Sequence, residues 1–167
     1  VKIANIDVDV NIINDGEGRV YSVDTKDKKP IEGKLRIVQG VKSQYIDAEF
    51  KAGYAVGTWK SYNNNKLVAE GSYKDGFPDG DFKTFYTDGN LESVSKYTMG
   101  KYDGKWVTYF ADDKVESEKE FKDGEANGLW VTYHSNGKKE SEKEYKNGKE
   151  DGIDRKYDED GNLRRDD

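Results

Sequence analysis

A glycine recurs at a nearly constant interval through most of this chain, and this spacing limits the possible folds more than any other feature. Successive members lie 24, 23, 24, 24 and 24 residues apart. They are Gly33, Gly57, Gly80, Gly104, Gly128 and Gly152. A fixed period in this range indicates an array of similar supersecondary units, each stacked on its neighbours.

Aromatic residues follow the same period. The third position of the unit holds Leu35, Trp59, Phe82, Trp106, Trp130 and Asp154, and the sixth holds Val38, Tyr62, Phe85, Tyr109, Tyr133 and Tyr157. The eighteenth position holds Phe50, Tyr73, Tyr97, Phe121 and Tyr145. The first and last units depart most from the pattern, as expected for the ends of a repeat array.

Two kinds of turn divide each unit. Asp-Gly or Asn-Gly pairs stand in the middle of several units (88–89, 136–137, 160–161) and near the end of several (75–76, 123–124, 147–148). Such pairs tolerate the positive φ that tight hairpin turns need, and the runs between them are rich in β-branched and aromatic residues. We therefore predict an all-β fold, an elongated single-layer antiparallel meander of six β-hairpin repeats of 23–24 residues.

The first part of the chain has a different pattern. From Asn5 to Ile12 polar and apolar residues alternate strictly, which predicts one half-buried strand. The run from Val20 to Val23 predicts a second, short strand. We expect residues 1–32 to form an N-terminal β cap that pairs with the repeat array over residues 33–167, all within one structural domain.

Composition narrows the classes of function. Apolar residues make up 33% of the chain and charged residues 37%, so we expect ladders of aromatic rings rather than a thick globular core. The net charge of -6 disfavours binding to nucleic acid. No run of apolar residues is long enough to span a membrane, and the lack of cysteine excludes disulfides and thiol chemistry.

The sequence offers no catalytic constellation. Its one histidine, His134, lies in an expected strand where the sister units hold Tyr86 and Phe110, and neither a phosphate-binding loop nor a nucleophile elbow occurs. Asp7, Asp9 and Asn11 are spaced like the first ligands of a calcium loop, but Ile12 stands where that loop needs glycine. We therefore expect no enzyme activity, no cofactor and no metal site.

Alternation along the strands assigns residues to two faces. In the fourth unit we expect Trp106 and Thr108 on one side and Tyr109 on the other. In its second strand we expect Val115, Ser117, Lys119 and Phe121 to share a side, opposite Glu116, Glu118 and Glu120.

Two sets of residues are candidates for binding a partner. The aromatic set is Trp59, Phe82, Trp106, Trp130, Tyr109 and Tyr133, and the acidic set is Glu116, Glu118, Glu140 and Glu142. The rings either serve only as the ladder of the fold or also form a docking surface, since Trp and Tyr are favoured interface anchors. The glutamates either form a solvated face or an acidic strip that steers a basic partner.

The repeat resembles a known family. The runs GLWVTYHSNG (128–137) and YKNGKEDG (145–152) are similar to the bacterial variant of the MORN repeat, and KPIEG (29–33) looks like the entry motif of bacterial MORN-repeat proteins described as antitoxins of toxin–antitoxin pairs. The resemblance covers about residues 20 to 163. It implies an elongated array of β-hairpins that acts by binding and carries no catalytic residues.

These observations favour a non-catalytic scaffold for protein–protein interaction, an antitoxin-like neutraliser being one form of it, with Trp106 and Trp130 as anchors. The alternative is a cell-envelope module that binds carbohydrate through the aromatic row, and self-association is open as well. The chain begins at Val1, so we expect that an upstream segment was removed. Cytoplasmic, cell-envelope and secreted locations all stay open, with the envelope favoured.

Overall fold

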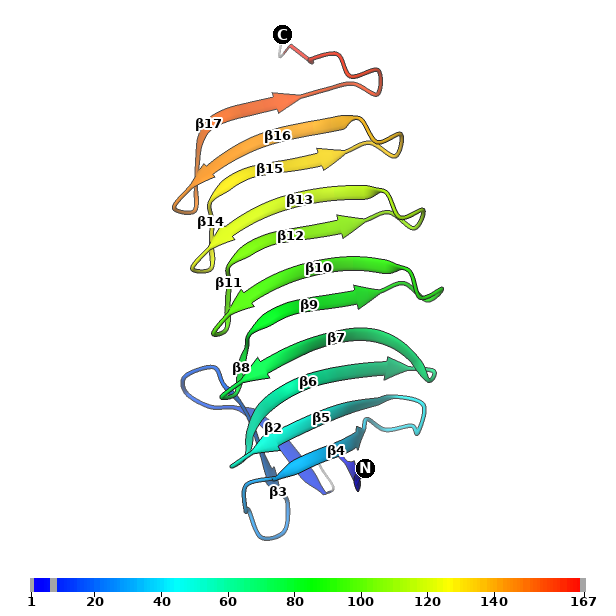
Figure 1. Cartoon of the computed structure of the whole chain (residues 1–167), viewed down its shortest axis with the longest axis vertical. Helices are drawn as coiled ribbons and strands as arrows, with labels where there is room; N and C mark the ends of the chain where they lie inside the picture. Colours follow the sequence, from blue (N-terminus) through cyan, green and yellow to red (C-terminus); the bar gives the residue numbers. More distant parts are fainter. Residues whose placement is uncertain (1, 7–8, 166–167) are drawn as a thin grey trace.

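The computed structural model describes residues 2–6 and 9–165, and it forms one long, open β-sheet (Figure 1). Eleven long strands follow one another along the sheet, each antiparallel to the next. They are β4 (Gly33–Val38), β5 (Tyr45–Lys51), β6 (Tyr54–Asn63), β7 (Lys66–Lys74), β9 (Gly80–Phe85), β10 (Leu91–Thr98), β12 (Gly104–Tyr109), β13 (Val115–Lys122), β15 (Gly128–Tyr133), β16 (Lys139–Lys146) and β17 (Lys149–Lys156). The prediction of an elongated all-β meander of hairpin repeats is confirmed.

A short strand precedes each of three repeats. These strands are β8 (Phe77–Pro78), β11 (Lys101–Tyr102) and β14 (Glu125–Ala126), and each pairs with the end of the preceding long strand. The turn before β14 shows why Asp-Gly recurs here. Asp123 and Gly124 have φ values of 50° and 85°, and two successive positive φ angles are the requirement of a tight type I′ hairpin turn.

The one short spacing, from Gly57 to Gly80, results from a shorter turn. Asn64 and Asn65 have φ values of 48° and 60° and close a two-residue turn between β6 and β7. The equivalent turn between β12 and β13 takes the five residues 110–114. The missing residue therefore lies outside the strands, and the second repeat keeps its strand pairing.

The hairpins β6–β7, β9–β10, β12–β13 and β15–β16 each contain a β-bulge, which overturns part of the expected alternation. Tyr109 pairs with Val115 and Thr108 pairs with Ser117, so Glu116 is an extra residue without a partner on β12. A bulge of this kind leaves two residues opposite one. Val115 therefore shares a face with Tyr109, and the expectation that Val115 and Ser117 lie on one side is wrong.

The N-terminal strands cover the first repeats. β1 (Lys2–Asn5) runs parallel to β4, while β2 (Val10–Asn14) and β3 (Val20–Asp24) form a hairpin whose β3 meets β6. The expectation of one continuous strand from Asn5 to Ile12 is wrong, because β1 ends at Asn5 and a new strand begins at Val10. Asp7 and Val8, which that expectation included, lie outside the described residues.

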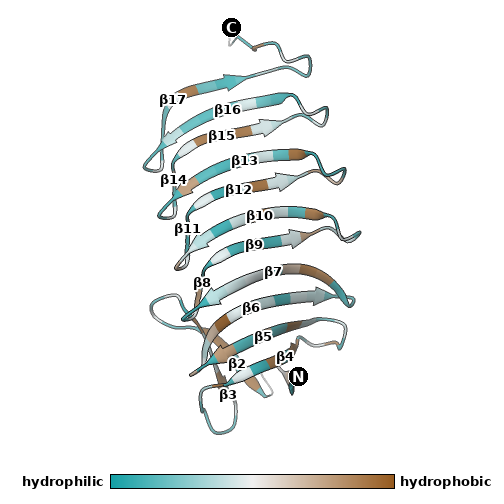
Figure 2. Cartoon of the chain, viewed as in Figure 1, coloured by the Kyte–Doolittle hydropathy of each residue, from teal (hydrophilic) through white to brown (hydrophobic). Residues whose placement is uncertain are grey.

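The main hydrophobic cluster lies where these N-terminal strands pack on the sheet. Ile37 is fully buried, and Leu35 and Phe50 are each 2% exposed. The other buried members are Ala4, Val10, Ile31, Ala48 and Ala55. Figure 2 shows hydrophobic residues in these strands, whereas β16 is mostly hydrophilic. The sheet is therefore backed by a second layer at its beginning, and a ladder of aromatic rings takes over further along.

Candidate interaction surface

The sheet has two distinct faces, which we name by their residues. The aromatic face carries Trp59, Phe82, Trp106 and Trp130, and the opposite face carries Tyr109 and Tyr133. Strand pairing decides this assignment, since directly paired residues share a face. Trp106 pairs with Lys119, whereas Tyr109 pairs with Val115. The six candidate rings thus form two groups on opposite sides of the sheet.

One unbroken row of rings runs along the aromatic face. Its members are Phe50, Trp59, Tyr73, Phe82, Tyr97, Tyr102, Trp106, Phe121, Trp130 and Tyr145. Successive centroids lie between 4.4 Å (Trp130 to Tyr145) and 5.5 Å (Tyr73 to Phe82) apart. After Phe50 every ring of the row is neither fully buried nor fully exposed. The row therefore holds neighbouring repeats together and also presents ring surface to solvent.

Two of the three indoles are fixed by hydrogen bonds to the backbone. Trp130 donates from Nε1 to the carbonyl of Glu120 at 3.0 Å, and Trp59 makes the same contact with Glu49 at 3.4 Å. The Nε1 of Trp106 is buried and has no hydrogen-bond partner among the described residues. The Nε1 of Trp130 therefore needs no hydrogen-bond partner from a bound molecule, and the ring of Trp130 is held in place before binding.

A row of hydroxyl pairs runs beside the rings on the same face. Thr84 lies 2.6 Å from Ser93, and the pairs Thr108–Ser117 and Thr132–Ser141 each span 2.7 Å between their oxygen atoms. We did not predict this row from the sequence. The signal was present, because threonine and serine recur with the repeat period in these strands.

A groove crosses the aromatic face over the fourth and fifth repeats. It has a volume of ≈ 580 Å³, and it is lined by Thr108, Phe110, Glu116, Ser117, Lys119, Thr132, Tyr133, His134, Ser135 and Glu140. A second hollow of ≈ 350 Å³ shares His134 and Glu140 with it and extends to Tyr157. Hydroxyl groups, one ammonium group and two carboxylates therefore face a common space beside Trp106 and Trp130.

The four candidate glutamates do not form one strip. Glu116 and Glu140 are bulge residues that line the groove. Glu118 and Glu142 pair with Val107 and Val131 on the opposite face. The expectation of a single acidic ladder is wrong, because the bulge separates neighbouring glutamates that simple alternation would keep together.

The glutamates of the opposite face are held by tyrosines of the following repeat strands. Tyr133 donates its hydroxyl to Glu118 at 3.0 Å, and Tyr157 donates to Glu142 at 2.7 Å. Glu142 is only 6% exposed and also pairs with Lys139. The hydrogen bonds from Lys139 and Tyr157 lower the pKa of Glu142 below its ordinary value. These contacts tie repeats together.

Four stretches of the chain match the MORN repeat variant when compared with known protein families. They are residues 55–75, 78–98, 102–123 and 126–147, about half of the chain. The chain belongs to the MORN repeat family. No curated protein sequence matches it significantly. MORN repeats generally act as non-catalytic scaffolds, commonly in interactions with proteins or membranes.

The matched MORN repeats coincide with the row of rings. Each contains one ring from its first long strand and one from its second, such as Trp106 with Phe121 and Trp130 with Tyr145. The hydroxyl pairs Thr108–Ser117 and Thr132–Ser141 also lie within matched repeats. The described part of the chain contains no apolar helix of the length that a lipid bilayer requires.

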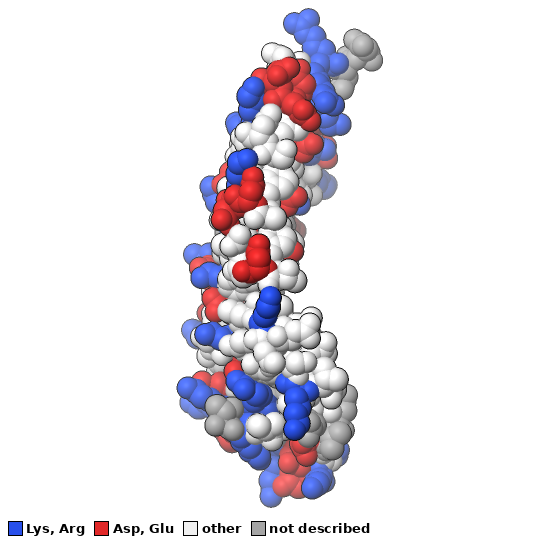
Figure 3. All heavy atoms as spheres, turned by 90° about the vertical axis from the view of Figure 1, so that its right-hand side faces the viewer, with Lys and Arg blue, Asp and Glu red and all other residues white. Residues whose placement is uncertain are grey.

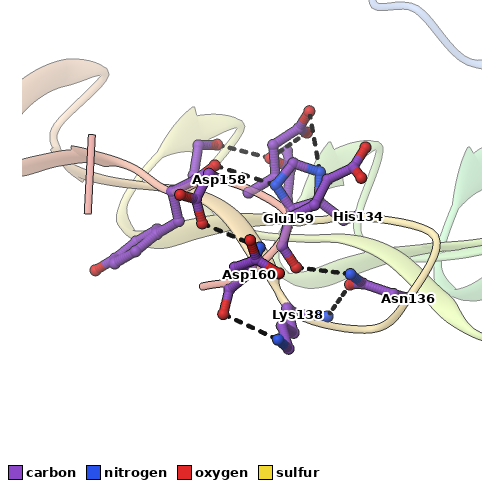
Figure 4. Close-up of polar contacts among 10 residues, drawn as sticks. His134, Asn136, Lys138, Asp158, Glu159 and Asp160 are labelled. Atoms are coloured by element: carbon purple, nitrogen blue, oxygen red, sulfur yellow. Dashed lines mark hydrogen bonds and ion pairs between the residues drawn. The ribbon is translucent and has the colours of Figure 1, made fainter. Parts of the chain in front are cut away.

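His134 joins two of these hairpins. Its Nε2 lies 3.1 Å from the carbonyl oxygen of Tyr157, one repeat further on. Tyr86, at the same position of an earlier repeat, donates its hydroxyl to the carbonyl of Tyr109 at 2.6 Å. Figure 4 shows His134 beside further contacts between the same two hairpin turns. The position thus serves to connect repeats.

The hairpin turns make their own contacts along one edge of the sheet. Asn136 donates to the carbonyl of Glu159 at 2.8 Å, and Lys138 donates to that of Asp160 at 2.9 Å (Figure 4). Lys114 reaches the carbonyl of Ser135 in the same way at 3.1 Å. Seen from this edge, the array is thin, and acidic side chains gather in separate patches along its upper half (Figure 3).

The buried Glu142 provides a first test of the contacts between repeats. We expect Glu142→Gln to lower the free energy of unfolding at neutral pH by about 1–2 kcal/mol, because it removes a charge-assisted hydrogen bond. Since folding lowers the pKa of Glu142, its stabilising effect is complete above the ordinary value of 4.5 and is lost as pH falls through the lower folded pKa.

Urea titrations at several pH values below neutrality would measure this effect. Glu142→Gln should show a smaller loss of stability on acidification than the parent chain, and Glu144→Gln on the same strand serves as the exposed control. An unchanged pH dependence in Glu142→Gln would contradict the assignment.

Proposed function

We propose that this chain is a non-catalytic scaffold that binds a protein partner through its aromatic face, with Trp106 and Trp130 as anchors. The observation that carries the proposal is the unbroken row of partly exposed rings over the matched repeats. Anchor residues in interfaces are most often Trp, Tyr and Arg. A row of rings held rigidly by its neighbours loses little conformational entropy when a partner covers it.

Charge favours a basic partner. The chain has a net charge of -6, and Glu116 and Glu140 line the groove beside the two anchors. Opposite charges across an interface raise the rate of association and suppress wrong partners. Neutralisation of a basic protein, as an antitoxin would achieve it, is one form that this function can take.

Carbohydrate binding is the competing function, and one observation favours it. The hydroxyl pair Thr108–Ser117 lies beside the partly exposed ring of Trp106, and sugars combine hydroxyl groups with faces that stack on rings. Salt distinguishes the two functions. A complex steered by glutamates weakens as ionic strength rises, whereas stacking of a neutral sugar does not.

A crosslinked pull-down from native extract, read by mass spectrometry, tests the scaffold. We expect the parent chain to capture one protein, and we expect Trp106→Ser/Trp130→Ser to lose it, because the variant removes both anchors. The matched control is Tyr109→Ser, which removes a ring from the same strand as Trp106 on the opposite face, outside the groove, and should keep the partner. Circular dichroism must show that both variants are folded.

The outcomes separate the possibilities. Capture that survives in the tryptophan variant and is lost in the tyrosine variant would move the interface to the opposite face. A protein captured equally by all three chains would contradict the proposal. Failure to capture any protein, together with salt-independent binding on a glycan array, would favour the carbohydrate function.

A further inference from the structure

Three glutamates occupy the same structural position in successive repeats. Glu92, Glu116 and Glu140 are each the extra residue of a bulge in the second long strand of a hairpin. Each lies two strands away from the next one along the sheet. Since neighbouring strands lie about 4.8 Å apart, the three positions recur about every 9.6 Å across the strands.

These three glutamates lack the partners that the opposite face provides. Glu92 and Glu116 make no hydrogen bond or ion pair with any described residue. Glu140 accepts a hydrogen bond from Thr132 at 3.0 Å and lies 4.0 Å from Nδ1 of His134. By contrast, Glu118 and Glu142 are bound by tyrosine hydroxyls. The carboxylates of Glu92 and Glu116 are thus free to bind cations from outside, whereas that of Glu140 is already in contact with Thr132 and His134.

The groove also holds hydrogen-bond donors that are free. Lys119 has its Nζ 5.0 Å from the ring of Trp130 and 6.0 Å from that of Trp106. Within the described residues it forms no ion pair. The pair Thr108–Ser117 uses one of its two hydroxyl hydrogens internally. The remaining hydrogen and the ammonium group can donate to carbonyl oxygens of a ligand.

A peptide that runs across the strands can match the spacing of the bulge glutamates in one extended conformation, the polyproline II helix. A polyproline II helix has three residues per turn and rises about 3.1 Å per residue, so it repeats about every 9.3 Å. Every third side chain then points the same way at nearly the spacing of the bulge glutamates. In a β-strand, residues three apart point to opposite sides. Polyproline II also leaves its backbone carbonyls unpaired and suits aromatic-lined grooves.

We infer that the groove on the aromatic face binds a polyproline II segment of a protein partner that carries a basic residue at every third position. The basic residues contact the bulge glutamates, the backbone carbonyls accept from Lys119 and the free hydroxyl, and proline rings pack on Trp106 and Trp130. This inference rests on the proposed scaffold function and specifies the chemistry of its partner.

Fluorescence anisotropy with synthetic peptides tests the inference on the full chain. The probe is a labelled peptide of four Pro-Pro-Arg units, compared with a peptide of the same composition whose arginines are clustered at one end. We expect the regular peptide to bind at least several-fold more tightly, because only its spacing matches the glutamates. A Pro-Pro-Glu peptide should not bind, and added salt should weaken the regular peptide.

A matched pair of variants locates the binding site. Glu116→Gln/Glu140→Gln should weaken the regular peptide about tenfold, since each variant removes a charge contact. Glu120→Gln/Glu144→Gln changes the same residue type in the same two strands, but these residues pair with Lys105 and Leu129 on the opposite face. The control pair should bind as the parent chain does.

Equal binding of the regular and clustered peptides would overturn the inference, and so would equal losses in the two pairs of variants. These results are separable from failure of the scaffold itself. If no peptide binds while Trp106→Ser/Trp130→Ser still abolishes capture of a protein, the occupant is wrong and the scaffold function stands. If peptides bind as expected but no protein depends on the two tryptophans, the groove is real and the proposed anchors are wrong.

Discussion

Phe50→Ala should lower the free energy of unfolding by about 3–5 kcal/mol, as expected when a large ring is removed from a packed core. Phe50 is 2% exposed and lies among the residues that join the N-terminal strands to the first repeat, including Leu35 and Ile37. Its ring also contacts Trp59 at a centroid distance of 5.3 Å. The cavity would therefore open at the junction of both layers.

Phe121→Ala is the matched control, because Phe121 occupies the same position of the fourth repeat, where the sheet is a single layer. Phe121 is only partly buried, against Tyr102, Trp106 and Trp130. We expect Phe121→Ala to lower the free energy of unfolding by about 1–2 kcal/mol, because the ring of Phe121 buries less apolar area than that of Phe50. Urea unfolding followed by circular dichroism measures both, and similar losses would contradict a core restricted to the first repeats.

Gly53→Ala should destabilise the chain by about 2–5 kcal/mol. Gly53 has a φ of 82°, where a side chain costs about 1–2 kcal/mol. An added Cβ atom would also lie 2.7 Å from Cζ of Tyr21, which packs on Tyr54, and overpacking of this kind costs about 1–3 kcal/mol. The backbone of Gly53 is fixed on both sides, since it donates to Ile31 and accepts from Ser22.

Gly124→Ala separates the two causes. Gly124 has nearly the same φ, 85°, but the nearest atom to its added Cβ would be 3.8 Å away, on Lys101. This variant should therefore show only the backbone cost of about 1–2 kcal/mol. Thermal or urea unfolding of Gly53→Ala and Gly124→Ala, measured side by side, would separate the backbone cost from the steric cost. Equal losses of stability in the two variants would show that Tyr21 moves aside without penalty.

The repeat period was sufficient to predict the hairpins and the shared face of the tryptophans. Glycine and aromatic positions that recur together report on backbone conformation and on side-chain stacking, and both are local properties of the chain. The turn at Asp123 and Gly124 and the row through Trp106 and Trp130 follow directly from them. The family resemblance carried the same information, and the match to MORN repeats confirms it.

The bulges and the arrangement of the N-terminal strands depend on contacts between distant residues, which the sequence pattern does not reveal. A bulge has no residue preference strong enough to identify Glu116 as the extra residue, so alternation placed Val115 on the wrong face. The alternation from Asn5 to Ile12 predicts one continuous strand. The structure instead has two strands, because β1 pairs with β4 while β2, which begins at Val10, pairs with β3. Such partners lie far away in the sequence, and periodicity cannot choose among them.

The bulge makes one position of each bulged strand independent of the strand register. Deleting Glu116 alone would join Val115 directly to Ser117 and keep the pairs Tyr109–Val115 and Thr108–Ser117, so the other side chains of β13 would stay on their faces. Deleting a paired residue such as Lys119 would instead shift the register of β13 by one residue and turn part of the strand to the other side of the sheet. Deleting a residue from a turn has no such effect, as the two-residue turn at Asn64 and Asn65 shows. Length changes in an array of this kind are therefore tolerated in turns, at bulges or as whole units, whereas loss of a single paired residue from a strand alters both faces of the sheet.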